Sequence, residues 1–190
     1  NDMPDNWMED AFSSVNRAME LDPDDPEAHR ILGAVKLMFE GDMDKAIFHH
    51  KKAIEICPSD TFHLARYAVL LSYLGETDQA IEQLDRALRI NPFGSDLIFE
   101  TQGVCKYLQQ NYSEALASFK NMQIDTRTSL FYSAACHKLL GNLDLSSEKL
   151  EIAKAESGMD IEKFVATQLY QDPSIPKDLI ANLSEIDTAA

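Results

Sequence analysis

The chain of 190 residues is poor in cysteine and glycine and has no long apolar run. Its three cysteines, Cys57, Cys105 and Cys136, are scattered and odd in number, which excludes a disulfide framework and is typical of a reducing compartment. The seven glycines form no phosphate-binding loop. No stretch approaches the roughly 18 to 20 apolar residues that span a bilayer. We therefore expect a cytoplasmic protein without a membrane partner.

Sequence patterns that carry metal binding or catalysis are also absent. The five histidines show no H-E-x-x-H spacing, and there is no C-x-x-C pair. His49 and His50 point about 100° apart on a helix, so they are poorly placed to share a metal ion. Residues 22–27 hold several carboxylates but lack the glycine and the spacing of a calcium loop, and no serine lies in a G-x-S-x-G motif. The sequence predicts no catalytic residue, no metal ligand and no cofactor, and therefore no enzyme.

Positive charge is scarce, because 17 lysines and arginines face 32 carboxylates and the formal net charge is −15. The first 28 residues contribute strongly, with nine carboxylates against Arg17 alone. Such a field repels phosphate backbones, so we expect no nucleic-acid partner. Two interpretations of this acidic segment stay open. One is a solvated surface that favours solubility, and the other is attraction of a basic partner.

What the chain does contain is a repeat. Residues 18–23, 53–58 and 87–92 share an alanine, apolar residues and a closing proline at equal positions, and their prolines lie 35 and 34 residues apart. Ala80, Leu84 and Ala87 illustrate a second shared pattern, with a large residue between two alanines at i, i+4 and i+7, which places all three on one helix face. A period near 34 with helical patterns on both sides of the proline is typical of stacked helix hairpins.

Glycine and proline mark the ends of the predicted helices. Gly41, Gly75 and Gly141 supply left-handed C-caps, and we expect Asn111 to take the same role in the remaining turn of this kind. Two units carry one extra residue, which we assign to their first helix. We expect helices near residues 7–21, 26–40, 43–56, 60–74, 77–90, 95–109, 112–122, 126–140, 143–156, 159–170 and 177–186.

These residues resemble tetratricopeptide repeats, whose first helix carries Leu-Gly and Tyr, whose second carries Ala, Phe and Ala, and whose last residue is Pro. The matching positions, unit by unit, are Leu32, Gly33, Ala46, Ala53 and Pro58; Tyr67, Ala68, Ala80, Leu84, Ala87 and Pro92; Gly103, Ala115 and Phe119; and Ala134, Leu150 and Ala153. The usual tryptophan is missing from every unit, and the last two units lack the proline.

The resemblance implies an all-α, right-handed superhelical solenoid of stacked antiparallel helix hairpins, and a protein-binding role. We expect about four and a half units over residues 1–158, with the first repeat incomplete. Residues 159–190 are expected to form a C-terminal helical cap and tail, because the end of a solenoid exposes a core edge that needs cover.

A narrower resemblance points to a context for the chain. Residues 28–33, 91–93 and 164–173 are similar to repeat regions at the C-terminus of bacterial class III adenylate/guanylate cyclase-like proteins, and some bacterial winged-helix regulators carry similar regions. This implies a regulatory or scaffold module of a larger signalling protein, with a catalytic or DNA-binding domain upstream. The alternative is a free-standing adaptor, or a structural protein that self-assembles through its N-terminal face, where Trp7, Phe12 and Val15 lack a partner helix.

The candidate site is the concave groove that the first helices line in this fold. By register, the inward positions hold Arg30, Phe62, Arg66, Tyr73, Glu100, Tyr107, Phe131 and Lys138. Aromatic side chains beside arginine are typical anchors for a protein or peptide partner, whereas the alternative is that several of them pack on one another. Some family members hold a terminal carboxylate with a Lys and Asn pair. Arg30 and Ala34, or Ala65 and Val69, stand at those positions here, so we expect no clamp of that type.

Overall fold

A computed structural model describes residues 7–187, and within this range all regular structure is helical. The elements are α1 (Trp7–Leu21), α2 (Pro26–Val35), η1 (Lys36–Glu40), α3 (Met43–Ile56), α4 (Thr61–Tyr73), α5 (Thr77–Ile90), α6 (Asp96–Leu108), α7 (Tyr112–Phe119), α8 (Arg127–Leu139), α9 (Leu143–Ser157), α10 (Ile161–Ala166) and α11 (Ser174–Asp187). Most bounds agree closely with the expected ranges, although α7 and α10 are shorter and α11 begins earlier. Among these helices none combines the length and the apolar content that a bilayer crossing requires.

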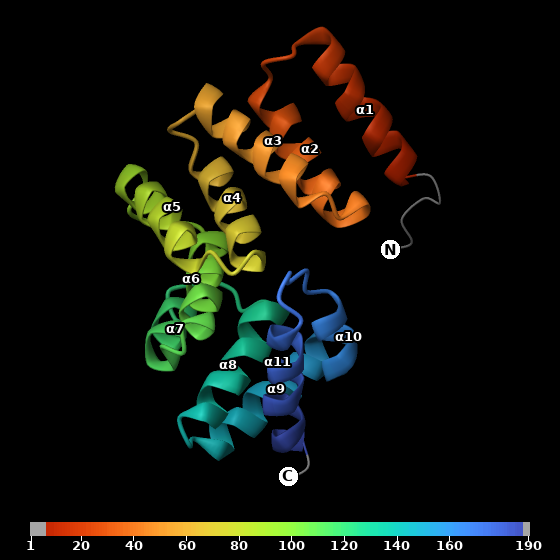
Figure 1. The fold of residues 1–190 in the computed structure, drawn as a ribbon. Coiled ribbons are helices and arrows are strands. Elements are labelled where there is room, and N and C mark those ends of the chain that lie inside the picture. The colour runs from red at the N-terminus through yellow and green to blue at the C-terminus, as the bar shows by residue number, and fades with distance from the viewer. Residues whose placement is uncertain (1–6, 188–190) are drawn as a thin grey trace.

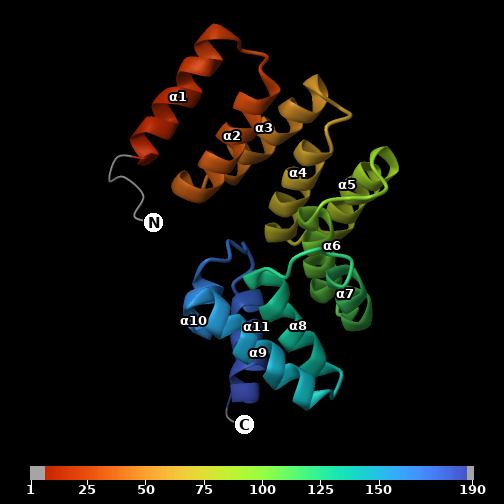
Figure 2. The ribbon, with the colours of Figure 1, turned by 180° about the vertical axis from the view of Figure 1, so that it is seen from behind.

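Consecutive helices pair into antiparallel hairpins, and the hairpins stack into a curved, right-handed solenoid (Figure 1). α2 packs on α3, α4 on α5, α6 on α7 and α8 on α9, while α4, α6 and α8 also contact one another in succession. α1 packs on α2 and lies at the opposite end of the molecule from α11 in both views (Figure 2). The predicted all-α solenoid is thereby confirmed.

Small residues let the two helices of a hairpin approach closely. A Cβ atom on Gly103 in α6 would lie 2.3 Å from Cε1 of Phe119 in α7. Gly33 in α2 faces His50 in α3 in the same way, because a Cβ atom on Gly33 would lie 2.7 Å from His50 Cδ2. His50 therefore occupies the place of the large repeat residue, and the contact of glycine with that residue sets the distance between the helices.

The turn inside each hairpin holds one residue in the left-handed conformation. Gly41, Gly75 and Gly141 have φ values of 63°, 79° and 79°, as predicted. In the remaining turn the residue with positive φ is Gln110, at 63°, whereas Asn111 is the N-cap of α7. The prediction for Asn111 is thus wrong by one residue, because asparagine is favoured at N-caps as well as at left-handed positions.

The two extra residues of the longer units are accommodated in different ways. The helix α2 continues into the π-helical turn η1, where the backbone N–H of Gly41 donates to the carbonyl of Lys36. In the unit that starts with α6, the extra residue lies in the loop before the helix, where Gly94 has a φ of 61°. The helix itself is no longer than its predecessor, since α4 and α6 both hold 13 residues. Only one of the two expected helix insertions therefore lies inside a helix.

The C-terminal segment folds back over the last hairpin. α10 packs on α11, and α11 packs on α8 and α9. In both views the loop between α10 and α11 extends toward α4 (Figures 1 and 2), and the backbone N–H of Gln171 donates to the carbonyl of Tyr73 at 2.9 Å. Residues 161–187 therefore cover α8 and α9 and also reach across the concave side of the array.

Candidate partner-binding groove

The chain itself fills the groove at its C-terminal end. Phe131 in α8 stacks on Phe164 in α10, with 4.1 Å between the ring centroids, and both side chains are fully buried. Lys138, further along α8, forms an ion pair with Glu185 of α11. Two of the predicted groove residues are therefore engaged within the chain, and no partner can reach Phe131 while α10 stays in place.

A cluster of tyrosines joins the middle of the groove to the same segment. Tyr73 in α4 packs edge-to-face on Tyr170, with 5.3 Å between ring centroids, and the hydroxyls of Tyr170 and Tyr132 lie 2.6 Å apart. Tyr107 packs on Tyr132 at 4.9 Å and accepts a hydrogen bond from Asn182 Nδ2 at 3.2 Å. Burial raises the pKa of Tyr107 to about 12 and raises the pKa of Tyr132 as well, so both phenols stay neutral. Tyr73 and Tyr107 thus pack the C-terminal segment onto the array.

The N-terminal half of the groove stays open around Phe62. This ring, near the start of α4, is 44% exposed. The guanidinium carbons of Arg30 and Arg66 lie 5.0 and 5.2 Å from its centroid, and Arg30 is also ion-paired with Glu27. A cation over an aromatic face gains about 0.5–1 kcal/mol at an exposed site. These contacts restrain the two arginine side chains and still leave Phe62 exposed. Phe62 therefore combines exposure with the fixed surroundings that a binding anchor needs.

A pocket of about 340 Å³ lies on the concave side next to this cluster. Its walls come from α2, η1, α3, α4, α6, α8 and the loop after α10. The apolar wall residues include Leu37, Val69, Leu97 and Leu169. Because Leu169 belongs to the C-terminal segment, that segment closes one side of the pocket as well as filling the groove beyond it.

Three charged residues line this pocket, each from a different inner helix. Arg66 of α4 and Arg127 of α8 are exposed to solvent, and neither forms an ion pair within the described part of the chain. Partial desolvation in the concavity lowers the pKa of Arg66, although the group stays charged at neutral pH. Glu100 of α6 accepts a hydrogen bond from the hydroxyl of Thr126, and burial raises the pKa of its carboxyl. The lining therefore holds two cations against one carboxylate.

The structure thus divides the eight predicted residues into three groups. Arg30, Phe62 and Arg66 come together at the open end, Tyr73 and Glu100 border the pocket, and Tyr107, Phe131 and Lys138 contact the C-terminal segment, as Tyr73 also does. Sequence reasoning missed Arg127 and Leu169. Arg127 is the first residue of α8, so the inward register could have included it, but no repeat pattern places the loop that carries Leu169.

Three histidines, His29, His49 and His63, make polar contacts around α2 without forming a metal site. The Nδ1 atoms of His29 and His49 lie 2.9 Å apart, and His29 Nε2 lies 3.0 Å from the carbonyl of Pro23. His63 Nε2 lies 3.3 Å from Glu27 Oε2. Across residues 7–187, no group of three His, Cys, Asp or Glu side chains is placed to hold a metal ion. These contacts instead connect α2 to α3 and to α4.

The two inner cysteines have no nucleophilic character. Cys105 and Cys136 are fully buried, and burial raises the pKa of each thiol to about 12. Both are therefore protonated at neutral pH, whereas the thiolate is the reactive form. They pack as small apolar side chains between helices.

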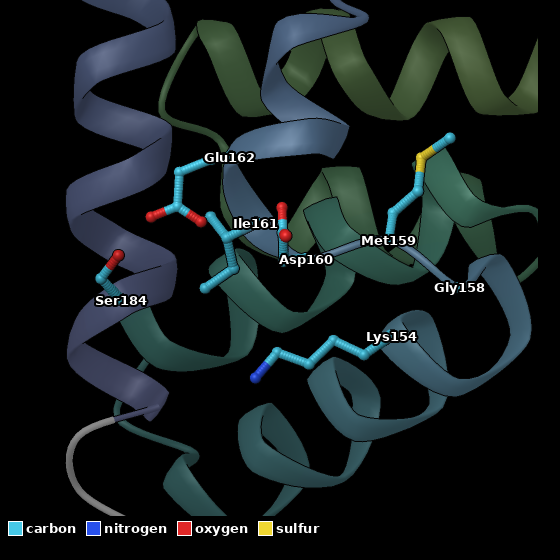
Figure 3. Close-up of a pocket in the computed structure, with 7 residues that line it drawn as sticks. All are labelled: Lys154, Gly158, Met159, Asp160, Ile161, Glu162 and Ser184. Carbon is cyan, nitrogen blue, oxygen red and sulfur yellow. The ribbon is translucent and has the colours of Figure 1, made fainter.

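A wider hollow of about 560 Å³ lies at the junction of α9, α10 and α11 (Figure 3). Lys154, Gly158, Met159, Asp160, Glu162 and Ser184 are among its lining residues. Asp160 is the N-cap of α10 and accepts a hydrogen bond from the backbone N–H of Lys163 at 2.8 Å, so its carboxylate stabilises the helix. The lining includes no aromatic side chain that could anchor a partner. The groove beside Phe62 is therefore the better candidate site.

Comparison with known sequences identifies one repeat directly. Residues 64–93, which hold most of α4 and α5, match the family model of the tetratricopeptide repeat. A curated relative, the Protein SGT1 homolog of Bos taurus, is 29% identical over 86 residues, which are 45% of this chain and 25% of that protein. The chain thus spans about a quarter of the length of this curated relative.

Solved structures share the fold over nearly the whole chain. A thermophilic TPR protein of Thermus thermophilus superposes with a TM-score of 0.69 at 20% identity, covering 95% of this chain and 91% of that one. YrrB, a TPR protein with an unusual peptide-binding site, superposes with a TM-score of 0.59 at 14% identity, covering 92% of this chain and 93% of that one. At these identities the likeness concerns the fold alone. The chain therefore has the fold of a tetratricopeptide repeat solenoid, in which residues 64–93 match the family's repeat.

Proposed function

We propose that the chain is a protein–protein interaction module that holds an extended segment of a partner protein in the open half of its groove. The observation that carries this proposal is the exposed ring of Phe62, placed between Arg30 and Arg66 next to a pocket of about 340 Å³. The other half of the groove offers no such surface, because residues such as Phe131 pack against the C-terminal segment. The fold supports a binding role, and YrrB, which shares it, has a peptide-binding site.

The physical basis of this role is a surface that is formed before the partner arrives. The hairpins are held by buried contacts such as Phe119 on Gly103, and Arg30 is held both by Phe62 and by Glu27. Side chains that are already ordered lose little conformational entropy on binding, so more of the contact energy appears as affinity. We therefore expect Phe62 to be the dominant anchor of the surface.

Selection of random displayed peptides on the immobilised chain tests the proposal. We expect peptides whose affinity, measured by fluorescence anisotropy, falls by about ten-fold or more in Phe62→Ala. Phe93→Ala is the matched control, because Phe93 is 90% exposed on the loop between α5 and α6 and does not line the pocket. A selection that yields no binder, or binders that are indifferent to Phe62→Ala, would overturn the proposal.

We further propose that this module belongs to a larger bacterial signalling protein, with residues 159–190 as its C-terminal cap and a catalytic or DNA-binding domain upstream. The support is the similarity of residues 28–33 and 164–173 to cyclase-associated repeat regions. The rival proposal is a free-standing adaptor. The full coding sequence of the gene decides between them, since an upstream domain supports the first and its absence supports the second.

Self-assembly through the N-terminal face has weaker support. Val15 is buried, and Phe12 packs near Phe39 with 6.2 Å between ring centroids, so both residues have cover within the chain. The side chain of Trp7 lies outside the described residues. Light scattering over a range of protein concentrations tests this alternative, and a monomer at every concentration excludes it.

A further inference from the structure

We propose that the partner segment is acidic, with one apolar side chain that enters the pocket beside Phe62 and a carboxylate on each side of it, received by Arg66 and Arg127. This inference rests on the proposed binding function and adds the chemistry of the partner. It follows from the two arginines of the pocket, which form no ion pair with a described residue although the chain is acidic.

Several cations of the chain are already paired with its own carboxylates. Such pairs are Arg30–Glu27, Lys36–Glu40, Lys106–Glu114, Lys138–Glu185 and Lys149–Asp125. Arg66 and Arg127 form no ion pair with any described residue, although the chain has 32 carboxylates for 17 lysines and arginines. Two unpaired guanidinium groups at one pocket of such a molecule are therefore a distinct local feature.

The environment of Arg66 favours a carboxylate over water as its partner. Its guanidinium lies near the Phe62 ring, with 5.2 Å from Cζ to the ring centroid, inside a concavity that removes part of its hydration. A guanidinium presents five N–H donors in a rigid fork that matches a carboxylate bidentately. An incoming carboxylate would supply the hydrogen-bond acceptors that the chain itself does not provide to Arg66.

The arrangement of the three charges favours an internal segment with two acidic side chains. Arg66 is on α4 and Arg127 is on α8, and α6 with Glu100 lies between these helices. Glu100 accepts a hydrogen bond from Thr126 and feels the charge of both arginines, but it forms an ion pair with neither, so each guanidinium still lacks a bidentate carboxylate partner. Because the two arginines lie on different helices of one pocket, a segment with an acidic side chain on each side of its apolar anchor places one carboxylate at each arginine.

The apolar anchor follows from the walls of the pocket, which Leu37, Val69, Leu97 and Leu169 line. The net charge of −15 adds a limit, because the field of the whole molecule repels a long polyanion. The acidity of the partner must therefore be local. A short peptide with two acidic side chains and one apolar side chain meets this limit, whereas a nucleic acid, which is a long polyanion, does not.

Peptide selection on three proteins tests the inference: the wild type, the Arg66→Gln/Arg127→Gln double variant, and Arg89→Gln. Arg89→Gln is a charge control away from the pocket: it removes one cation, which is exposed near the end of α5 and does not line the pocket. We expect peptides from the wild type and the control to carry Asp or Glu on both sides of an apolar residue, and peptides from the double variant to lack this pattern. Binders from the wild type without acidic residues would overturn the inference and leave the proposed function in place.

A selected peptide then measures the coupling between the charges. Replacing its two acidic residues by Asn and Gln is expected to weaken binding to the wild type by about ten-fold or more, and to change binding to the double variant little. Arg66→Lys is expected to fall in between, since it keeps the charge and loses the fork. Equal losses in the wild type and the double variant would overturn the inference. Equally tight binding of a peptide whose only carboxylate is its free C-terminus would overturn the requirement for two carboxylates.

Discussion

Phe164 of α10 lies nearly parallel to Phe131 of α8, with 9° between the ring planes, although the two residues belong to different parts of the chain. Both are fully buried and belong to one apolar cluster with residues of α6, α7, α9 and α11. The C-terminal segment is therefore part of the core of the last hairpins. Changes in this segment act on stability and also on the shape of the groove.

Phe164→Ala is expected to lower the free energy of unfolding by about 3–5 kcal/mol, because it removes a fully buried ring and leaves a cavity against Phe131. Urea denaturation followed by circular dichroism measures the change. Phe93→Ala is the control and is expected to stay within about 0.5 kcal/mol, since Phe93 is exposed. Equal stability of Phe164→Ala and the wild type would show that the segment is not packed on the array.

Gly103→Ala is expected to destabilise the chain by about 1–3 kcal/mol, because the new Cβ atom would lie 2.3 Å from Phe119 Cε1. The measurement is again urea denaturation. In a Phe119→Leu background, which lacks Cε1 and Cζ, the same substitution should cost less. A cost that is unchanged in that background would mean that the ring of Phe119 is not the cause.

The chain is expected to lose stability in acid because of the buried imidazole of His50. Burial lowers its pKa from 6.5 to about 4 in the folded chain. Because the folded pKa is the lower one, the stability contributed by the neutral form is fully present above pH 6.5 and is lost as the pH falls toward 4. The loss from this group amounts to about 3 kcal/mol across that window.

The variant His50→Phe removes the titrating group. A phenyl ring is expected to fit there, because Phe119 packs on Gly103 at the equivalent position of another hairpin. We expect the variant to fold and to lose less stability than the wild type between about pH 7 and pH 4.5, since only the wild type must protonate a buried imidazole. Carboxylates elsewhere titrate alike in both proteins. The same drop in the two unfolding free energies would contradict the assignment to His50.

Tyr170→Phe is expected to cost about 1–3 kcal/mol, because it leaves the buried hydroxyl of Tyr132 without the partner that lies 2.6 Å away. The Tyr132→Phe/Tyr170→Phe double variant removes both hydroxyls and should be more stable than the sum of the single changes predicts. Thermal unfolding of the four proteins gives this coupling. Strict additivity would show that the two hydroxyls do not interact.

The helices and hairpins could be predicted from the sequence because local residues determine them. Pro58 and Pro92 end helices through their ring geometry, and Gly75 and Gly141 supply the left-handed turns. The errors are also local. Asn111 is favoured in two adjacent roles, and the length of a unit does not reveal whether an extra residue forms a π turn, as after Val35, or a longer loop, as at Gly94.

The covered half of the groove could not be predicted in the same way. The contact of Tyr73 with Tyr170 joins a repeat to a segment that has no repeat pattern, so periodicity carries no information about it. The inward register placed Arg30, Phe62 and Arg66 together, because all three depend only on the helices that hold them. It also named Phe131, whose ring is unavailable to a partner because of Phe164.

The fold-back of the C-terminal segment limits how long a bound partner segment can be. Neighbouring inner helices lie about 8–10 Å apart in such packing, and α4, α6 and α8 are the three that bring charge to the pocket. A path across them measures about 16–20 Å, which an extended chain covers in about five or six residues at roughly 3.3 Å each. The open surface therefore suits a short linear motif.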